Sequence, residues 1–145
     1  MFKSSASERM TRWKLFRKDI GGMPLPDAMI AANDFWNPCP FIPFYLTPED
    51  VTSWPDPWQL LDDNIYCSYS RALGMIYTLV LLGIIDIDLV DAIDYNSVSV
   101  VLVLVDNAKY VMNYWPGTVV NNKLQNFTVV RSYDLSHIIK KIGTL

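Results

Sequence analysis

The chain has 145 residues, of which 51% are hydrophobic and 19% charged. This composition excludes intrinsic disorder, and the length suits one domain. The most apolar run, Ala72 to Ile85, is too short for a membrane span of about twenty residues. The first residues also lack the apolar core of a secretory signal. We therefore expect one soluble domain over residues 1–145, made in the cytoplasm, not secreted and without a membrane partner.

Charge is segregated along the chain, although the net charge is only −3. Residues 1–18 carry +5, residues 19–106 carry −12, and residues 107–145 carry +4. Opposite charges on separate parts of one chain favour head-to-tail attraction between copies. We divide the chain into a basic helical arm (1–22), a Pro/aromatic-rich segment (23–58) and an α+β core (59–145).

The first half of the chain contains helix signals and many prolines. Residues 7–18 predict an amphipathic helix capped by Ser7 and stopped by Gly21 and Gly22. The prolines of residues 22–58 predict loops and extended chain, and the aromatics between them indicate wrapping over an apolar surface. Short helices are expected to begin at Thr47-Pro48 and Asp56-Pro57, where a capping residue precedes a proline.

The second half changes from helical to strand patterns. Residues 65–82 are apolar nearly all round and predict a buried central helix ended by Gly83. Ile84 to Asn96 predicts a short helix with an acidic outer face. Four β-rich runs follow, and Asp134 begins a last helix with apolar residues at helical spacing. The runs are Val98 to Val105, Tyr110 to Trp115, Thr118 to Val120 and Phe127 to Tyr133.

These elements predict an α+β fold. It has N-terminal helices, a Pro/aromatic-rich extended segment, a buried central helix, a C-terminal antiparallel sheet and a short terminal helix.

Cys67 is the candidate nucleophile, because it lies in the first turn of the buried helix. The partial positive charge of a helix N-terminus lowers a thiol pKa and raises the thiolate population. Without a secretion signal, Cys39 and Cys67 are expected to be free thiols. Packing is the other reading of Cys67, since a cysteine in a buried helix is often a small core residue.

Residues 54–134 resemble the transglutaminase-like and papain-like group of thiol enzymes. The resemblance rests on the order of Trp54-Pro55, Leu60-Leu61, Cys67 ahead of Ala72-Leu73-Gly74, and a strand pair ending in Tyr114-Trp115-Pro116-Gly117. It implies a nucleophilic cysteine, a histidine base from a following strand, and an acid or amide that orients the histidine.

The sequence departs from that group at the base. The resemblance places the histidine around Ala108 to Tyr110, where there is none. The only histidine, His137, falls on the terminal helix and off its apolar stripe. Without a base, Cys67 keeps its ordinary nucleophilicity, so we predict no catalytic residue and read Cys67 as a packing residue or the remnant of an inactive site. The alternative is a thiol hydrolase or transferase that uses Cys67.

Two charged clusters have competing readings. Asp86, Asp88, Asp91 and Asp94 could bind a divalent cation, but they lack the glycine and distal glutamate of a calcium loop, so we expect a solvated or partner-facing surface and no cofactor. The basic arm could be a solvated helix face, a docking surface for an acidic protein, or a nucleic-acid contact. A nucleic-acid-binding accessory protein is thus a second alternative, which the acidic middle of the chain argues against.

Taken together, these features favour a non-enzymatic structural or assembly protein in a larger complex. The chain resembles minor virion components of tailed bacteriophages, such as tail, neck or baseplate connectors, which implies a final location in a virus particle. Its expected partners are other protein subunits, including copies of itself. The expected partner-binding residues are Arg9, Arg12, Trp13, Lys14, Phe16, Arg17, Lys18, Phe35, Trp36, Phe41 and Phe44.

Overall fold

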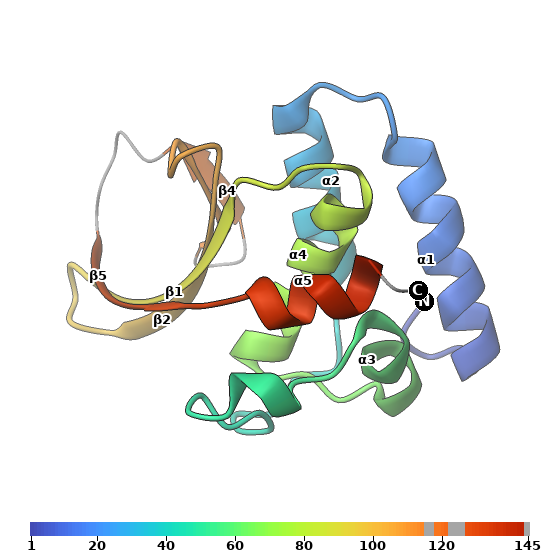
Figure 1. Cartoon of the computed structure of the whole chain (residues 1–145), viewed down its shortest axis with the longest axis horizontal. Helices are drawn as coiled ribbons and strands as arrows, with labels where there is room; N and C mark the ends of the chain where they lie inside the picture. The colour runs from blue at the N-terminus through green and yellow to red at the C-terminus, as the bar shows by residue number, and fades with distance from the viewer. Residues whose placement is uncertain (115–117, 122–126, 144–145) are drawn as a thin grey trace.

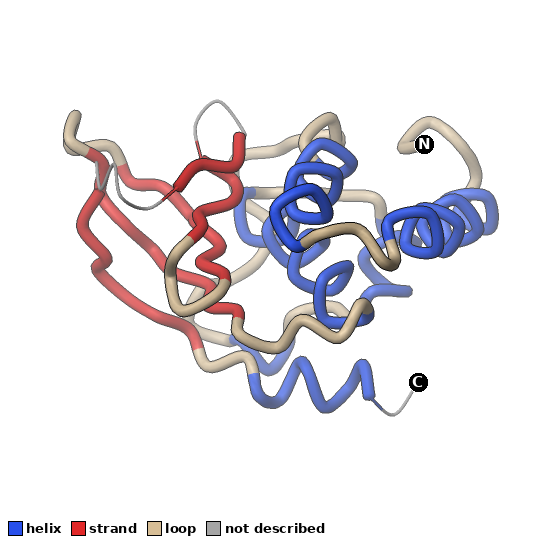
Figure 2. The backbone as a smooth tube through the Cα atoms, turned by 90° about the horizontal axis from the view of Figure 1, so that it is seen from above, coloured by secondary structure: helices blue, strands red, loops and turns tan. Residues whose placement is uncertain are grey.

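A layer of helices covers one face of an antiparallel sheet in the computed structural model, which describes residues 1–114, 118–121 and 127–143. Figure 1 shows the curled sheet on one side and the helices on the other, and Figure 2 shows the same two layers from above. The α+β fold expected from the sequence is confirmed. No helix in this described part is long and apolar enough to cross a membrane.

Two N-terminal helices pack on the body of the molecule. Helix α1 (Ala6–Ile20) begins after Ser5, whose side chain accepts a hydrogen bond from the Glu8 N–H, so the cap is Ser5 and not Ser7. Helix α2 (Leu25–Trp36) lies where we expected loops. That expectation was wrong because Pro24 and Pro26 stand at the start of the helix, where a missing N–H costs nothing.

The next elements lead to the central helix. A short 3-10 turn, η1 (Val51–Ser53), precedes α3 (Pro57–Asp63), which is capped by Asp56 through the Gln59 N–H as expected. Helix α4 (Ser68–Leu81) follows and is buried along most of its length. Leu82 is its C-cap residue, and Gly83 follows with a positive φ of 89°.

The sheet has the strand order β4-β3-β2-β1-β5 among the described residues. Its strands are β1 (Ile87–Asp94), β2 (Ser99–Val105), β3 (Tyr110–Tyr114), β4 (Thr118–Asn121) and β5 (Phe127–Tyr133). Each neighbouring pair is antiparallel, so β1 to β4 form a meander and β5 returns to pair with β1. Helix α5 (Ser136–Gly143) closes the chain and contacts α4 and η1. The predicted turn at Trp115-Pro116-Gly117 lies outside the described residues.

The segment from Ile84 to Asn96 contains strand β1, so the short helix that we expected there was wrong. Ile87 and Leu89 are buried while Asp86 and Asp88 are exposed, which is the two-residue period of a strand. Pairing along the whole length of β2, from Ile87 opposite Val105 to Ile93 opposite Ser99, satisfies the backbone. Pairing with a distant strand cannot be seen in the local sequence, so the alternation of aspartates with aliphatic residues was taken for a helix with an acidic face.

The main core lies between the helices and the sheet. Trp13, Trp36 and Trp54 are fully or almost fully buried there, with α4 at the centre. A second, smaller apolar cluster lies elsewhere in the sheet and consists of Val90, Ala92, Leu102, Leu104 and Val111. The alternation of β2 explains it: Val101, Val103 and Val105 pack in the main core, whereas Leu102 and Leu104 belong to the second cluster. The main core joins α4 to the sheet, whereas the second cluster joins β1, β2 and β3 to one another.

Candidate functional site

Cys67 caps the N-terminus of α4. Its backbone N–H donates to the Ser70 hydroxyl at 2.7 Å, and its side chain accepts from the Ser70 backbone N–H, so the two residues form a reciprocal capping box. Free N–H groups point out of the first turn of any helix, because they have no acceptor within the helix. The sequence thus places the thiol among hydrogen-bond donors.

The surroundings of Cys67 favour its thiolate. Burial alone raises the pKa of the thiol. Hydrogen bonds from the Ser70 hydroxyl, which lies 3.4 Å from Sγ, and from the backbone N–H groups of Leu46, Ser70 and Tyr69 outweigh burial. The pKa of Cys67 is therefore lowered from its ordinary value, which increases the fraction of reactive thiolate near neutral pH.

Cys39 provides an internal contrast. Both cysteines are free and buried. Burial raises the pKa of the Cys39 thiol to about 12, and the nearby Arg71 charge offsets only part of that rise. One cysteine of this chain is thus held as a thiol and the other is moved toward the thiolate.

A pocket of about 620 Å³ lies beside the first turns of α4. We call it the Asn113 pocket. Ser68 and Arg71 line it from α4, Val101 lines it from β2, and Asn113 lines it from β3. The remaining lining residues are Phe41, Asp94, Asn96, Val98, Ser99 and Val100. Cys67 directly precedes Ser68 in the chain, but it is buried and is not itself a lining residue of this pocket.

Asn113 reaches this pocket because the strand pairing is irregular there. The register of β3 with β4 shifts between Val111 and Tyr114, and Asn113 has a positive φ of 61°. Its backbone N–H donates to Asn33 Oδ1 of α2 at 2.8 Å, and its Nδ2 donates to the Val101 carbonyl at 2.9 Å. Bulges of this kind redirect side chains near functional sites. Asn113 was not among the predicted site residues, and its only signal in the sequence is a single amide within an apolar strand.

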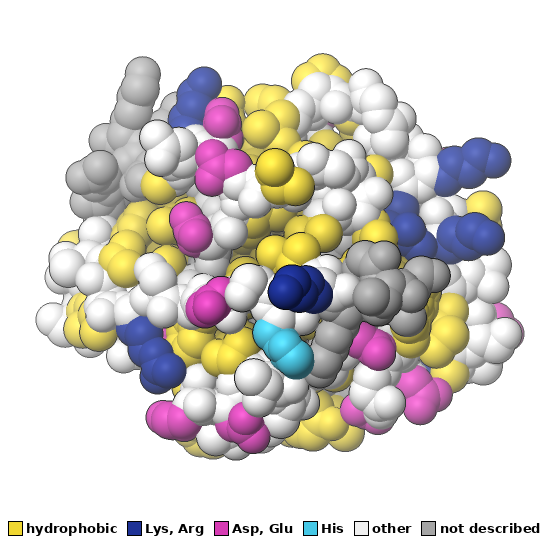
Figure 3. All heavy atoms as spheres, in the orientation of Figure 1, with side chains coloured by type: hydrophobic (Ala, Val, Ile, Leu, Met, Phe, Trp, Pro, Cys, Tyr) yellow, Lys and Arg dark blue, Asp and Glu magenta, His cyan; other side chains and the backbone are white. Residues whose placement is uncertain are grey.

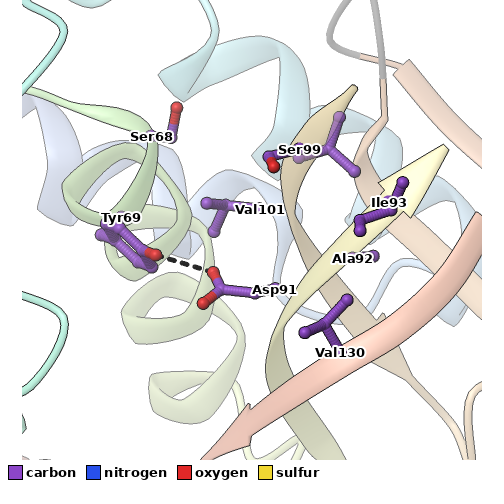
Figure 4. Close-up of a pocket in the computed structure, with 9 residues that line it drawn as sticks. Ser68, Tyr69, Asp91, Ala92, Ile93, Ser99, Val101 and Val130 are labelled. Atoms are coloured by element: carbon purple, nitrogen blue, oxygen red, sulfur yellow. Dashed lines mark hydrogen bonds between the residues drawn. The ribbon is translucent and has the colours of Figure 1, made fainter. Parts of the chain in front are cut away.

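A second pocket, of about 300 Å³, adjoins the first and shares Ser68, Ser99, Val100 and Val101 with it. In Figure 4 the Tyr69 hydroxyl points to Asp91, and Ser99 and Val101 lie near the first turn of α4. Tyr69 donates to Asp91 Oδ1 at 2.7 Å, and Tyr133 donates to Oδ2 at 2.5 Å. Both carboxylate oxygens of Asp91 are therefore engaged in joining α4, β1 and β5.

No base accompanies Cys67 among the described residues. His137 lies exposed on α5, as its helix phase predicted. Ala108 and Lys109 occupy the turn between β2 and β3, and the strand residues at the Asn113 pocket are Asp94, Ser99, Val100, Val101 and Asn113, none of which is a histidine. Among the described residues, the Cys67 thiol thus has a lowered pKa and no neighbouring histidine.

The expected partner-binding residues fall into different environments. Arg9, Trp13 and Trp36 are buried in the chain's own core, and Phe16 stacks on Phe35 with ring centroids 4.1 Å apart. Phe44 is 91% exposed and Phe41 is about half exposed. Figure 3 shows Lys and Arg side chains gathered over α1. Partner binding by the exposed residues, Arg12, Lys14, Lys18, Phe41 and Phe44, stays a prediction.

The acidic residues of β1, and Asp86 just before it, do not gather into a metal site. In the described part of the chain, no group of three or more His, Cys, Asp or Glu side chains is arranged to hold a metal ion. Asp86 and Asp88 are exposed, Asp91 accepts from two tyrosines, and Asp94 Oδ1 accepts from the backbone N–H groups of Asn96 and Val98, each at 2.9 Å.

Comparison with solved structures relates this chain to LapG of Legionella pneumophila. A LapG structure matches with a TM-score of 0.74 and 13% sequence identity over 94% of this chain and 89% of LapG. The calcium-bound form matches with a TM-score of 0.74 and 14% identity over 91% of this chain and 77% of the other. No family model matches the sequence, and no curated protein does either. At this identity, the likeness establishes the fold.

These matches correct our main functional expectation. LapG is a cysteine protease of the transglutaminase-like fold, so the resemblance that we noted for residues 54–134 extends over nearly the whole chain. The expectation of a non-enzymatic bacteriophage assembly protein was wrong by this comparison, and the likeness to virion proteins finds no support. That expectation rested on the absence of a histidine around Ala108 to Tyr110.

Proposed function

We propose that this chain is a cysteine-dependent hydrolase or transferase whose nucleophile is Cys67. The observation that carries the proposal is the position of Cys67 at the N-cap of a buried helix, with its thiol pKa lowered by hydrogen bonds from the backbone and from Ser70. The fold shared with LapG supports the same assignment.

In the proposed reaction, the Cys67 thiolate attacks the carbonyl carbon of an acyl substrate. A carbon–sulfur bond forms, the bond to the leaving group breaks, and the leaving group takes up a proton. Water or an amine then attacks the thioester, which releases the acyl product and returns the sulfur as thiolate or thiol. Ser68, Arg71 and Asn113 line the space in which such a substrate would lie.

Two different buried cysteines make the proposal testable by labelling with iodoacetamide near neutral pH. Cys39 is 6% exposed and Cys67 only 2%, so access alone would favour Cys39. The opposite pKa shifts predict the reverse order, with Cys67 labelled faster by about tenfold or more through its larger thiolate fraction. Mass spectrometry of the labelled peptides measures both rates in one sample.

Serine variants supply matched controls. Cys67→Ser keeps a good N-cap residue and removes the thiolate, so we expect a folded protein that has lost the fast label. The Cys39→Ser variant should still be labelled rapidly at Cys67. Acylation by p-nitrophenyl acetate, followed by intact mass, should modify the wild type and the Cys39 variant and spare the Cys67 variant. Equal labelling of the two thiols, or faster labelling of Cys39, would remove Cys67 as the nucleophile.

A further inference from the structure

Arg71 brings a positive charge without a counter-ion to the wall of the Asn113 pocket. Its guanidinium lies over the Phe41 ring, with Cζ 5.1 Å from the ring centroid. Its enclosed Nε has no acceptor, and no carboxylate in the described part of the chain pairs with the group. The N–H donors lie in the plane of the guanidinium, so a contact through its face leaves them unused. The terminal nitrogens are not enclosed as Nε is, so an acceptor from outside the chain can reach them.

The residues around Arg71 do not neutralise its charge. This charge acts on Cys39, but burial raises the pKa of that thiol to about 12, so Cys39 is uncharged near neutral pH. Asp94 also lines the pocket and lies at the end of β1. Its Oδ1 accepts from the backbone N–H groups of Asn96 and Val98, which hold the carboxylate in the turn after β1. In the described part of the chain, Arg71 therefore lacks the anionic partner that a partly buried cation needs.

The rest of the pocket suits a small ligand with an apolar body and a polar end. Its volume of about 620 Å³ lies within the range of about 300–1,000 Å³ that small-molecule sites occupy. Val98, Val100 and Val101 give it an apolar wall. Ser68 and Ser99 add hydroxyl groups to the lining, and Figure 4 shows Ser68 on α4 and Ser99 on β2. A ligand in this space can place apolar groups on the valines and an acceptor on the guanidinium.

We propose that the Asn113 pocket binds a carboxylate borne by an apolar group, with Arg71 as its counter-ion. The two oxygens of a carboxylate match two parallel N–H donors of a guanidinium. Phosphate offers the same match, but the apolar wall and the nearby charge of Asp94 oppose its second negative charge. The C-terminus of a peptide with an apolar last residue carries this chemistry, and so does a free aliphatic acid. The inference concerns binding alone and does not rest on a reaction at Cys67.

Two small acids test the proposal as probes. N-acetyl-leucine and 4-methylpentanoate carry the same isobutyl group and carboxylate, with and without a peptide-like amide. Titration of the full chain followed by heteronuclear NMR measures both affinities. We expect saturable binding with a Kd on the order of 1 mM, and shifts in the backbone signals of Ser68, Ser99 and Val101. The acid that binds more tightly tells whether the natural ligand is a peptide end or a free acid.

The matched controls are the amides of the two acids, which have the same shape and no charge. Each amide should bind at least about tenfold more weakly than its acid, because it cannot form the charge-assisted pair with Arg71. Amides that bind as tightly as the acids would overturn the proposal, and so would the absence of saturable binding by either acid.

Variants of the two charged lining residues locate the effect. Arg71→Gln keeps a long polar side chain that suits a helix, and it should weaken acid binding about tenfold, to the level of the amide. Asp94→Asn keeps Oδ1 for the turn and removes the negative charge, so it should tighten acid binding about twofold. Weaker acid binding by the Asp94 variant would contradict the proposed charge preference of the pocket.

The outcome stays decidable if a variant is unstable. If Arg71→Gln fails to fold by circular dichroism, the comparison of acid with amide on the wild type still decides. Iodoacetamide labelling of Cys67 tests the proposed function separately. A chain that labels rapidly at Cys67 and prefers no acid over its amide refutes this inference alone, whereas slow labelling refutes the proposed function and leaves the binding result to be judged by the titration.

Discussion

At the scale of single residues, Thr78 organises the largest side chains of the core. Its Oγ1 accepts from the indole N–H of Trp13 at 3.0 Å and from that of Trp36 at 2.9 Å. The same hydroxyl donates to the Gly74 carbonyl at 2.8 Å. One hydroxyl on α4 therefore satisfies two indoles that come from α1 and α2.

Replacing Thr78 by Val should destabilise the protein by about 2–4 kcal/mol, since two buried N–H groups lose their acceptor while the volume is kept. Thr78→Ser is the matched control, because it keeps the hydroxyl and removes one methyl group, at a cost of about 1 kcal/mol. Urea unfolding followed by tryptophan fluorescence measures both. A valine variant as stable as the serine variant would show that the shared acceptor is unimportant.

At the scale of elements, α2 and α4 approach each other at Gly74. A Cβ added there would lie 2.4–2.7 Å from ring atoms of Trp36, closer than any ordinary contact. The indole cannot move freely, because it is fully buried and bonded to Thr78. The missing side chain of Gly74 thus sets how closely the two helices pack.

Gly74→Ala should lower the free energy of unfolding by about 1–3 kcal/mol through overpacking, although alanine is the better helix former. Gly21→Ala is the control: its Cβ would meet neighbours at 3.4 Å or more and its φ of −62° suits alanine, so a change within about 0.5 kcal/mol is expected. Denaturant titration compares the two. An unchanged or more stable Gly74 variant would contradict the close packing.

At the scale of the whole molecule, buried phenols and a buried thiol make stability depend on alkaline pH. Burial raises the pKa values of Tyr69 and Tyr77, and the bonds of Tyr69 to Tyr133 and Asp91 raise its value further. Burial raises the pKa of the Cys39 thiol as well, to about 12. The folded protein therefore holds these protons more tightly than the unfolded chain. Cys67 has the opposite shift, so it adds stability above its lowered pKa.

The sign of these shifts predicts that stability is retained below pH about 9 and falls as the pH rises through about 10 and beyond. Urea midpoints measured from pH 8 to 11.5 test this directly. Tyr77→Phe removes one titrating phenol and should make stability fall less steeply with pH. It should also lower stability by the same amount at every pH, because the hydrogen bond to the Pro55 carbonyl is lost. A flat profile above pH 10 would mean that these phenols ionise without unfolding the protein.

Much of the architecture could be read from local patterns, and the rest depended on distant contacts. The apolar helix headed by Cys67, the β-branched run of β2 and the helix after Asp134 have strong periodic signals, so they were predicted. Strand β1 was missed, because its pairing with β2 and β5 is absent from its own sequence. Cys67 was found from its place before the helix. Asn113 required a register shift and a partner, Val101, from another strand.

Arg9 gives the basic arm a role that its composition conceals. Its Nε donates to the Leu61 carbonyl at 2.7 Å and its Nη2 to the Asp62 carbonyl at 3.2 Å, at the end of α3, and the same guanidinium binds the Ser4 carbonyl. Residues 1–22 are therefore held against α3 by the Arg9 guanidinium. We expect this segment to resist trypsin in the native protein. Deleting residues 1–22 would remove Trp13 and expose the core residues Trp36 and Trp58 that it contacts. We expect the truncated protein to aggregate.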